Sequence, residues 1–118
     1  MKHVFYLDTC SSCRRILRDI NPGTEFEFQN IKNSPISEEQ LDLLAELNGS
    51  YESLFNKQAR KYREMELFKK ELEEKDFKNL ILKEYTFLKR PIFLINSSVY
   101  ICKNRTNIVN VKDKIKSI

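Results

Sequence analysis

The sequence predicts an α/β protein with one mixed four-stranded sheet, and three observations carry this prediction. Residues 4–31 have the pattern of a strand, a helix and a second strand with short connections, which is typical of a parallel βαβ unit with a right-handed crossover. Residues 37–87 place apolar side chains at helical spacing. Residues 92–118 have the pattern of a β-hairpin followed by a helix. We therefore expect the order β-α-β, helical insertion, β-β-α within one domain covering residues 1–118.

The two strands and the helix of the βαβ unit differ in their patterns. Residues 4–7 form a β-rich apolar run that ends abruptly, as a buried strand does. Residues 11–20 place apolar and charged side chains on opposite sides of a helix, which ends at an Asn-Pro-Gly segment. Residues 24–31 alternate polar and apolar side chains, so we expect a second strand with Phe26 and Phe28 on one face.

A capping box opens the helical insertion. Ser37 is followed three residues later by Gln40, and at this spacing each side chain hydrogen-bonds the backbone N–H of the other residue. Apolar side chains then recur every three or four residues, so we expect further helices over residues 62–72 and 77–85.

The last part of the chain predicts two strands and a terminal helix. Residues 92–95 and 99–102 are β-rich and are separated by an Asn-Ser-Ser turn. Residues 106–118 carry apolar side chains on one helical stripe, which predicts a helix. Together with the βαβ unit, this hairpin completes the four strands of the expected sheet.

Charge and hydropathy limit the partners that we expect. The formal net charge is +4, from 21 Lys and Arg against 17 Asp and Glu, and the two signs are interleaved over most of the chain. The stretch from residue 88 onward is more basic, but it lacks interleaved exposed aromatic side chains, so we interpret it as a solvated surface without direct nucleic-acid binding. No apolar run approaches the roughly 18 residues of a membrane span. We therefore expect a cytoplasmic monomer that does not bind a membrane.

Cys10 and Cys13 form a Cys-x-x-Cys pair at the start of the first predicted helix. A helix N-terminus presents unsatisfied backbone N–H groups and the positive end of the helix dipole, and both lower the pKa of a thiol placed there. Because the thiolate is the nucleophile, Cys10 is the candidate attacking group, and Cys13 can resolve a mixed disulfide by closing an internal bond. Three cysteines, an odd number, do not make a disulfide framework.

A zinc site and a pair of ordinary core cysteines are alternatives for this motif. A structural zinc site needs four ligands, and only Cys102 and His3 remain to complete one, so we expect no bound metal. Cys102 falls in a predicted strand, where it fills a place for a small apolar side chain. His3 lies at a strand end, and we expect an exposed or hydrogen-bonded histidine rather than a catalytic base.

Arg90 and Pro91 directly precede a predicted strand. A peptide bond before proline can be cis and can press backbone groups toward a facing thiol, although most such bonds are trans. On its own this feature is weak, but beside the cysteine motif it makes Pro91 a candidate site residue.

Three segments, in this order, resemble the arsenate reductase and Spx family of thioredoxin-like proteins. Residues 6–15 resemble the nucleophile loop of the family, residues 50–65 its central arginine segment and residues 87–92 its Arg-cis-Pro motif. The resemblance covers nearly the whole chain and implies a thioredoxin-like fold, with residues 37–87 as an insertion.

The resemblance also implies roles for single residues. Cys10 corresponds to the catalytic cysteine, Arg90 to an arginine that holds an oxyanion or thiolate, and Pro91 to the cis-proline. Arsenate reductases of this family attack arsenate with the cysteine and are recycled by glutathione and glutaredoxin. We therefore expect no bound cofactor, glutathione as a candidate reductant, and glutaredoxin or thioredoxin as candidate thiol–disulfide partners.

Three departures from the family pattern favour a disulfide over arsenate as the substrate. Gln58 stands where an arginine usually contacts the oxyanion, and Arg60 is two residues along, which on a helix places it on a different face. An irregular local backbone would still let Arg60 reach the oxyanion, so Arg60 stays a candidate substrate-binding residue. Lys103 stands where the reductases usually carry an arginine, so a point charge replaces a bidentate fork. Classical reductases also have a single cysteine in the loop that here holds Cys13. Because arsenate needs several converging donors, we predict a thiol–disulfide oxidoreductase, with arsenate reduction doubtful.

Two other functions remain open. One is an Spx-like regulator, in which the Cys-x-x-Cys disulfide switches a surface that binds a protein partner such as RNA polymerase. The other is a family member that has lost catalysis, for which Gln58 is the best argument.

Overall fold

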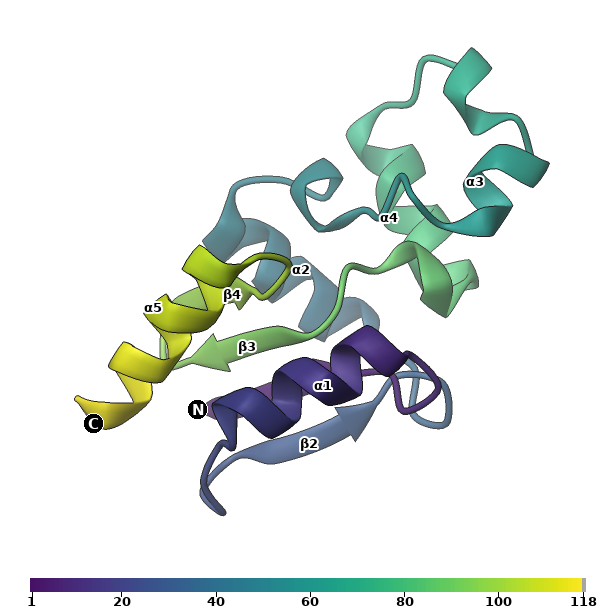
Figure 1. The fold of residues 1–118 in the computed structure, drawn as a ribbon. Helices are drawn as coiled ribbons and strands as arrows, with labels where there is room; N and C mark the ends of the chain where they lie inside the picture. Colours follow the sequence, from purple (N-terminus) through teal and green to yellow (C-terminus); the bar gives the residue numbers. More distant parts are fainter. Residues whose placement is uncertain (118) are drawn as a thin grey trace. The chain divides into compact units, whose positions relative to one another are not determined.

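The computed structural model describes residues 1–117, and the chain forms two compact units (Figure 1). The first unit contains residues 1–34 together with the chain from Arg90 onward, and the second contains Pro35–Lys89. The predicted helical insertion over residues 37–87 therefore falls within the second unit. Ile118, the last residue of the predicted terminal helix, lies outside the described residues.

A four-stranded mixed sheet forms the centre of the first unit, as predicted. Its strand order is β2-β1-β3-β4. The strands are β1 (Lys2–Tyr6), β2 (Glu27–Asn30), β3 (Ile92–Ile95) and β4 (Ser98–Ile101). β1 pairs parallel with β2 and antiparallel with β3, so that His3 lies opposite both Glu27 and Leu94. The parallel pair is the one that the βαβ pattern predicts, and β3 and β4 form the predicted antiparallel hairpin.

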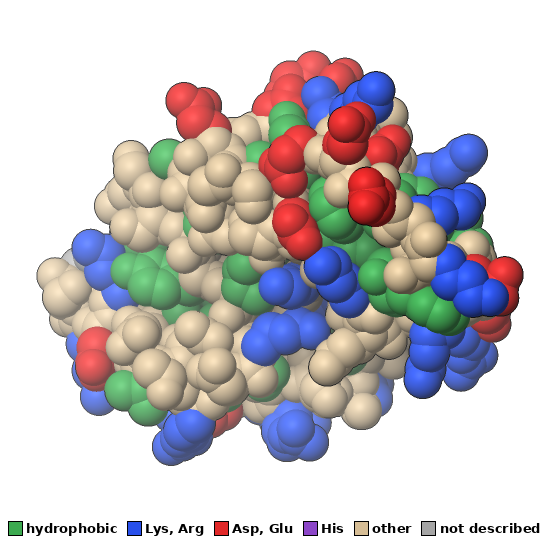
Figure 2. Space-filling model, turned by 90° about the horizontal axis from the view of Figure 1, so that it is seen from above, with side chains coloured by type: hydrophobic (Ala, Val, Ile, Leu, Met, Phe, Trp, Pro, Cys, Tyr) green, Lys and Arg blue, Asp and Glu red, His purple; other side chains and the backbone are tan. Residues whose placement is uncertain are grey.

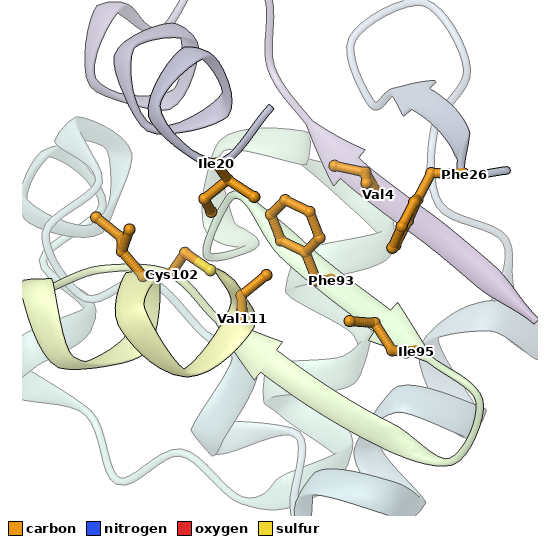
Figure 3. Close-up of a cluster of buried hydrophobic side chains, with 8 residues drawn as sticks. Val4, Ile20, Phe26, Phe93, Ile95, Cys102 and Val111 are labelled. Carbon is orange, nitrogen blue, oxygen red and sulfur yellow. The ribbon is translucent and has the colours of Figure 1, made fainter. Parts of the chain in front are cut away.

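The helices α1 (Ser11–Ile20) and α5 (Arg105–Lys116) pack on one face of this sheet (Figure 1). Between them and the strands lies a cluster of buried side chains, with Phe93 of β3 among Ile20 of α1, Val111 of α5 and Val4 of β1 (Figure 3). The rings of Phe26 and Phe93 meet edge to face, with centroids 6.0 Å apart. Burial of this apolar surface is the main force that holds the two helices on the sheet.

Phe28 differs from Phe26 in burial, although the sequence pattern treats the two alike. In the parallel register Phe28 lies opposite Val4, but its side chain is 48% exposed. β2 is an edge strand, and the rings of Phe28 and Tyr6 meet edge to face, with centroids 6.1 Å apart. The strand predicted over residues 24–31 is shorter in the structure and begins at Glu27, so Phe26 lies in the bend before β2 and the two rings do not share one strand.

The second unit is helical and packs around the ring of Phe55. Its α-helices are α2 (Glu38–Asn48), α3 (Arg60–Glu64) and α4 (Glu74–Lys83), and its 3-10 turns are η1 (Glu52–Leu54), η2 (Leu67–Lys69) and η3 (Tyr85–Phe87). The Phe55 ring stacks on Phe87 with centroids 4.9 Å apart and meets Phe77 edge to face at 5.0 Å. These aromatic contacts join segments that are up to 32 positions apart in the chain.

The prediction of one helix over residues 62–72 is wrong, because the structure has the short helix α3 and the 3-10 turn η2 in this stretch. α3 ends at Glu64, and Glu66 adopts the left-handed conformation with φ of 54°. Met65 and Phe68, two of the apolar side chains at helical spacing in this stretch, are 47% and 55% exposed. Figure 2 shows that hydrophobic side chains also lie between acidic and basic side chains on one face of the molecule.

The capping box at the start of α2 provides a test of local stability. Gln40 N–H donates to Ser37 Oγ at 3.1 Å, and Ser37 N–H donates to Gln40 Oε1 at 3.0 Å. Ser37→Ala leaves a helix N–H without its acceptor, so we expect the free energy of unfolding to fall by about 1 kcal/mol. Urea denaturation followed by circular dichroism measures this change. Ser97→Ala is the control, because the exposed Ser97 side chain has no partner in residues 1–117; equal losses in both variants would contradict the capping argument.

Candidate redox site

Cys10 sits where the chain turns from β1 into α1. Its N–H donates to the carbonyl of Leu7 at 3.2 Å, and its own carbonyl accepts from Arg14 N–H at 3.1 Å, the first hydrogen bond of the helix. Cys10 is thus the N-cap residue of α1, with an extended backbone and a side chain that makes no capping hydrogen bond. The half-buried thiol is therefore available to a molecule in solution.

Cys13 lies one helical turn further along and is completely buried. Removal from water raises the pKa of its thiol to about 11. The negative charge of the Cys10 thiolate adds to this rise in pKa, whereas a backbone hydrogen bond from Leu7 and the positive charge of Arg90 oppose it. The two sulfurs of the motif therefore differ: one is accessible, and the other is kept protonated at neutral pH.

Arg90 and Pro91 lie on the same side of the first unit as the cysteine pair. The charge of Arg90 acts on the Cys13 thiol, so the structure brings these two predicted site residues together. The peptide bond between Arg90 and Pro91 is cis. Pro91 is buried, and its carbonyl accepts from Cys102 N–H at 3.0 Å, which ties the start of β3 to the end of β4.

Cys102 and His3 are both buried. Cys102 is fully buried in the cluster under α1 and α5, as expected for a small apolar side chain, although β4 ends at Ile101 and Cys102 directly follows the strand. Burial raises the pKa of its thiol to about 12. The charge of the Cys13 thiolate contributes to this shift. The His3 ring stacks near Phe5, and its Nε2 lies 2.8 Å from Gln29 Oε1, so His3 is hydrogen-bonded, as predicted, and buried.

The remaining predicted site residues lie apart from one another in the chain and differ in local structure. Lys103 is exposed, and its N–H donates to Ile101 at 3.1 Å just after β4. Gln58 and Arg60 belong to the second unit, where both are exposed. Gln58 lies in a turn, with its N–H donating to Asn56 Oδ1 at 3.1 Å, and Arg60 is the first residue of α3. Gln58 and Arg60 therefore do not share one helix, and the irregular backbone that sequence analysis gave as the alternative is the one observed.

The structure adds one contributor that sequence analysis missed. Leu7 stabilises the turn twice, through its carbonyl to Cys10 and through its backbone hydrogen bond to Cys13. Both groups belong to the main chain, so no side-chain pattern could have indicated them. Within residues 1–117, no group of three His, Cys, Asp or Glu side chains is placed to hold a metal ion, and no helix is long and apolar enough to cross a membrane.

The burial of Cys13 and Cys102 predicts a stepwise pH dependence of alkylation. Near neutral pH we expect iodoacetamide to modify Cys10 and to leave Cys13 and Cys102 unmodified. Each pH unit below its pKa lowers the thiolate fraction of a cysteine about tenfold, so Cys13 should react as the pH approaches 11 and Cys102 as it approaches 12. Peptide mass spectrometry measures the modification, with circular dichroism as a check that the protein stays folded. Modification of Cys13 as fast as Cys10 near pH 7 would contradict this prediction.

The sequence and the fold of this chain are similar to those of known proteins. The model of the ArsC family matches residues 5–111. The chain is 28% identical over 110 residues to the global transcriptional regulator Spx of Streptococcus mutans, covering 92% of this chain and 80% of that protein. Its fold is similar to that of arsenate reductase from Vibrio cholerae (TM-score 0.78, 17% identity, 93% and 96% of the two chains). It is also similar to a putative arsenate reductase from Yersinia pestis (TM-score 0.75, 16% identity, all of both chains). The chain has a thioredoxin-like fold and belongs to the ArsC family.

Proposed function

We propose that this member of the ArsC family is a thiol–disulfide oxidoreductase in which Cys10 attacks and Cys13 resolves. The observation that carries the proposal is the contrast between the two sulfurs of the motif. Cys10 is accessible at the N-terminus of α1, and Cys13 is completely buried one turn later. An oxidoreductase needs this division, because the first sulfur must meet the substrate and the second must meet only the first.

The reaction balances as a two-electron transfer. The Cys10 thiolate attacks one sulfur of a substrate disulfide, forms a mixed disulfide and releases the other substrate sulfur as a thiolate. Cys13 then loses its proton to solvent and attacks Cys10 Sγ, which forms the Cys10–Cys13 disulfide and releases the second substrate sulfur. The substrate disulfide is reduced and the protein dithiol is oxidised. An external thiol, such as glutathione or a thioredoxin or glutaredoxin, must supply two electrons to reset the pair.

Arg90 and the Leu7 main chain favour the second attack. Burial opposes formation of the Cys13 thiolate, whereas the charge of Arg90 and the Leu7 hydrogen bond lower the pKa of this thiol and so stabilise the thiolate. Arg90 is therefore a positioning residue for resolution in this proposal. A reducing compartment such as the cytoplasm suits the cycle, because thiols there are regenerated.

Disulfide rather than arsenate is the proposed substrate. An arsenate oxyanion needs several donors that converge on one tetrahedral group. By the family resemblance Gln58 replaces one arginine and Lys103 replaces another, and an amide and a point charge bind an oxyanion more weakly than two guanidinium forks. A disulfide is uncharged and needs no such set.

A redox-switched regulator is the second candidate, and the 28% identity to an Spx regulator favours it. In that case the Cys10–Cys13 disulfide changes a surface that binds a protein partner, such as RNA polymerase. Turnover separates the two candidates. A switch needs one oxidation event, whereas an oxidoreductase reduces many substrate molecules for each protein molecule when an external thiol is present.

Replacement of single cysteines tests whether Cys10 attacks the substrate and Cys13 resolves the mixed disulfide. With a peptide disulfide as substrate and an external thiol as reductant, we expect Cys10→Ser to abolish turnover. In the absence of the external thiol, which would itself cleave a mixed disulfide, Cys13→Ser should accumulate the Cys10 mixed disulfide, and intact-protein mass spectrometry detects it as the added mass of the bound peptide. Cys102→Ala is the matched control and should retain turnover, since this cysteine lies in the core cluster. Full turnover by Cys13→Ser would contradict the resolving role.

Substitution of Gln58 tests whether the protein prefers a disulfide to arsenate as its substrate. We expect the natural protein to reduce arsenate poorly in the presence of glutathione, glutaredoxin and thioredoxin, and Gln58→Arg to raise that rate about tenfold or more by restoring one oxyanion donor. Gln58→Ala is the control, because it removes the amide without adding a donor. Efficient arsenate reduction by the natural protein would exclude the disulfide preference.

A further inference from the structure

The charges of this protein are divided unequally between its two units. Of the 21 Lys and Arg, 11 lie in the first unit and 10 in the second, whereas the 17 Asp and Glu divide as 5 and 12. The first unit therefore has a formal charge of +6 and the second of −2. The unit that carries the cysteine pair is the basic one, although the whole chain is only weakly basic.

Three arginines form the outer side of α1, and we call Arg14, Arg15 and Arg18 the arginine ridge. All three are exposed, on the side of the helix opposite the buried residues Cys13 and Ile20. None of the three makes an ion pair within residues 1–117. Arg14 and Arg15 lie near the positive end of the helix dipole, which disfavours cations, whereas Arg18 lies in the last turn, where the dipole favours them. Within the described residues, no ion pair therefore accounts for the three arginines.

The acidic side chain on α1 that could neutralise the ridge is already paired. Asp19 accepts hydrogen bonds from Arg105 and Lys112 of α5, and these contacts lower the pKa of its carboxyl group. Asp8, in the loop before Cys10, is the other carboxylate near the start of the helix. The ridge therefore keeps a positive potential along the side of α1 that faces solvent, beginning at the reactive thiol.

The geometry points to a preference for acidic protein disulfides: we propose that the arginine ridge binds carboxylates of the substrate chain beside the cysteine that Cys10 attacks. This inference rests on the proposed oxidoreductase function and deepens it by naming the substrate class. A helix rises 1.5 Å per residue, so Arg14 lies about 6 Å and Arg18 about 12 Å along the axis from Cys10. An extended peptide covers about 3.3 Å per residue, so the favoured acidic side chains lie about two to four positions from the attacked cysteine.

An acidic peptide fits these observations better than a nucleic acid. The ridge begins within one turn of Cys10, so a chain held along it places a disulfide at the thiol. Arginine also pairs with carboxylates in a bidentate manner. A phosphate backbone would use the same charges but would bring no group for the thiol to attack, so nucleic-acid binding is an outcome that the test must separate.

The test uses three synthetic peptides that differ only in charge. Each has one cysteine blocked as a 2-thiopyridyl disulfide, with two Glu, two Gln or two Lys placed two to four positions away. Release of thiopyridone measures the rate of attack by the reduced protein. At low ionic strength we expect the Glu peptide to react about tenfold faster than the Gln peptide and the Lys peptide to react slowest, and about 0.5 M salt should remove the difference.

Matched variants assign the preference to the ridge. In the combined variant Arg14→Gln, Arg15→Gln and Arg18→Gln, the ratio of the Glu rate to the Gln rate should fall to about one, and the ratio cancels any change in Cys10 reactivity. The control variant Lys2→Gln, Lys114→Gln and Lys116→Gln also removes three positive charges from the first unit, but at the end that holds both chain termini (Figure 1). This control variant should leave the ratio of the Glu rate to the Gln rate unchanged.

Each outcome decides between distinct conclusions. Equal Glu and Gln rates in the natural protein, or equal loss of the ratio in both combined variants, would overturn the ridge proposal and leave the oxidoreductase proposal standing. Suppression of the Glu preference by micromolar duplex DNA at about 0.15 M salt would reassign the ridge to a phosphate backbone. If no peptide reacts at Cys10, the proposed function itself fails.

Discussion

The proposed chemistry depends on one turn of helix α1, which holds one sulfur at the surface and the next in the core. The backbone of Leu7 accepts a hydrogen bond from Cys10 N–H and provides one to Cys13, so the end of β1 determines where both thiols lie. The buried cluster around Phe93 holds α1 against the sheet and so keeps this turn in place. The contrast in accessibility between two identical side chains thus follows from packing and not from the residue type.

Much of this arrangement could be predicted because the relevant signals are local. The capping box at Ser37 and the β-rich runs around the hairpin each depend on residues close together in the chain, and all three elements are present. The order of elements then limited the sheet to a parallel pair joined to a hairpin, which is the observed topology. The family was also recognisable, since the three segments that resemble it are short and each can be read from neighbouring residues.

The features that escaped prediction depend on the third dimension or on backbone conformation. The apolar spacing over residues 62–72 is helical, but the left-handed conformation of Glu66 breaks the helix, and this conformation leaves no clear sign in the residue types. Arg60 begins α3 while Gln58 precedes it, so an argument from helical faces could not apply to that pair. The division of charge between the two units was visible only in part: the basic stretch from residue 88 onward shows in the sequence, whereas its union with residues 1–34 in one unit depends on the fold.

The burial of Cys13 and Cys102 also bears on how the protein withstands oxidants. Peroxides react with thiolates, and two of the three sulfurs are kept as neutral thiols inside the core, so damage is directed to Cys10. A sulfenic acid formed there has a reserve thiol one helical turn away with which it can condense, before further oxidation makes the change irreversible. The hydrophobic core therefore keeps Cys13 and Cys102 as thiols that oxidants in solution do not reach directly.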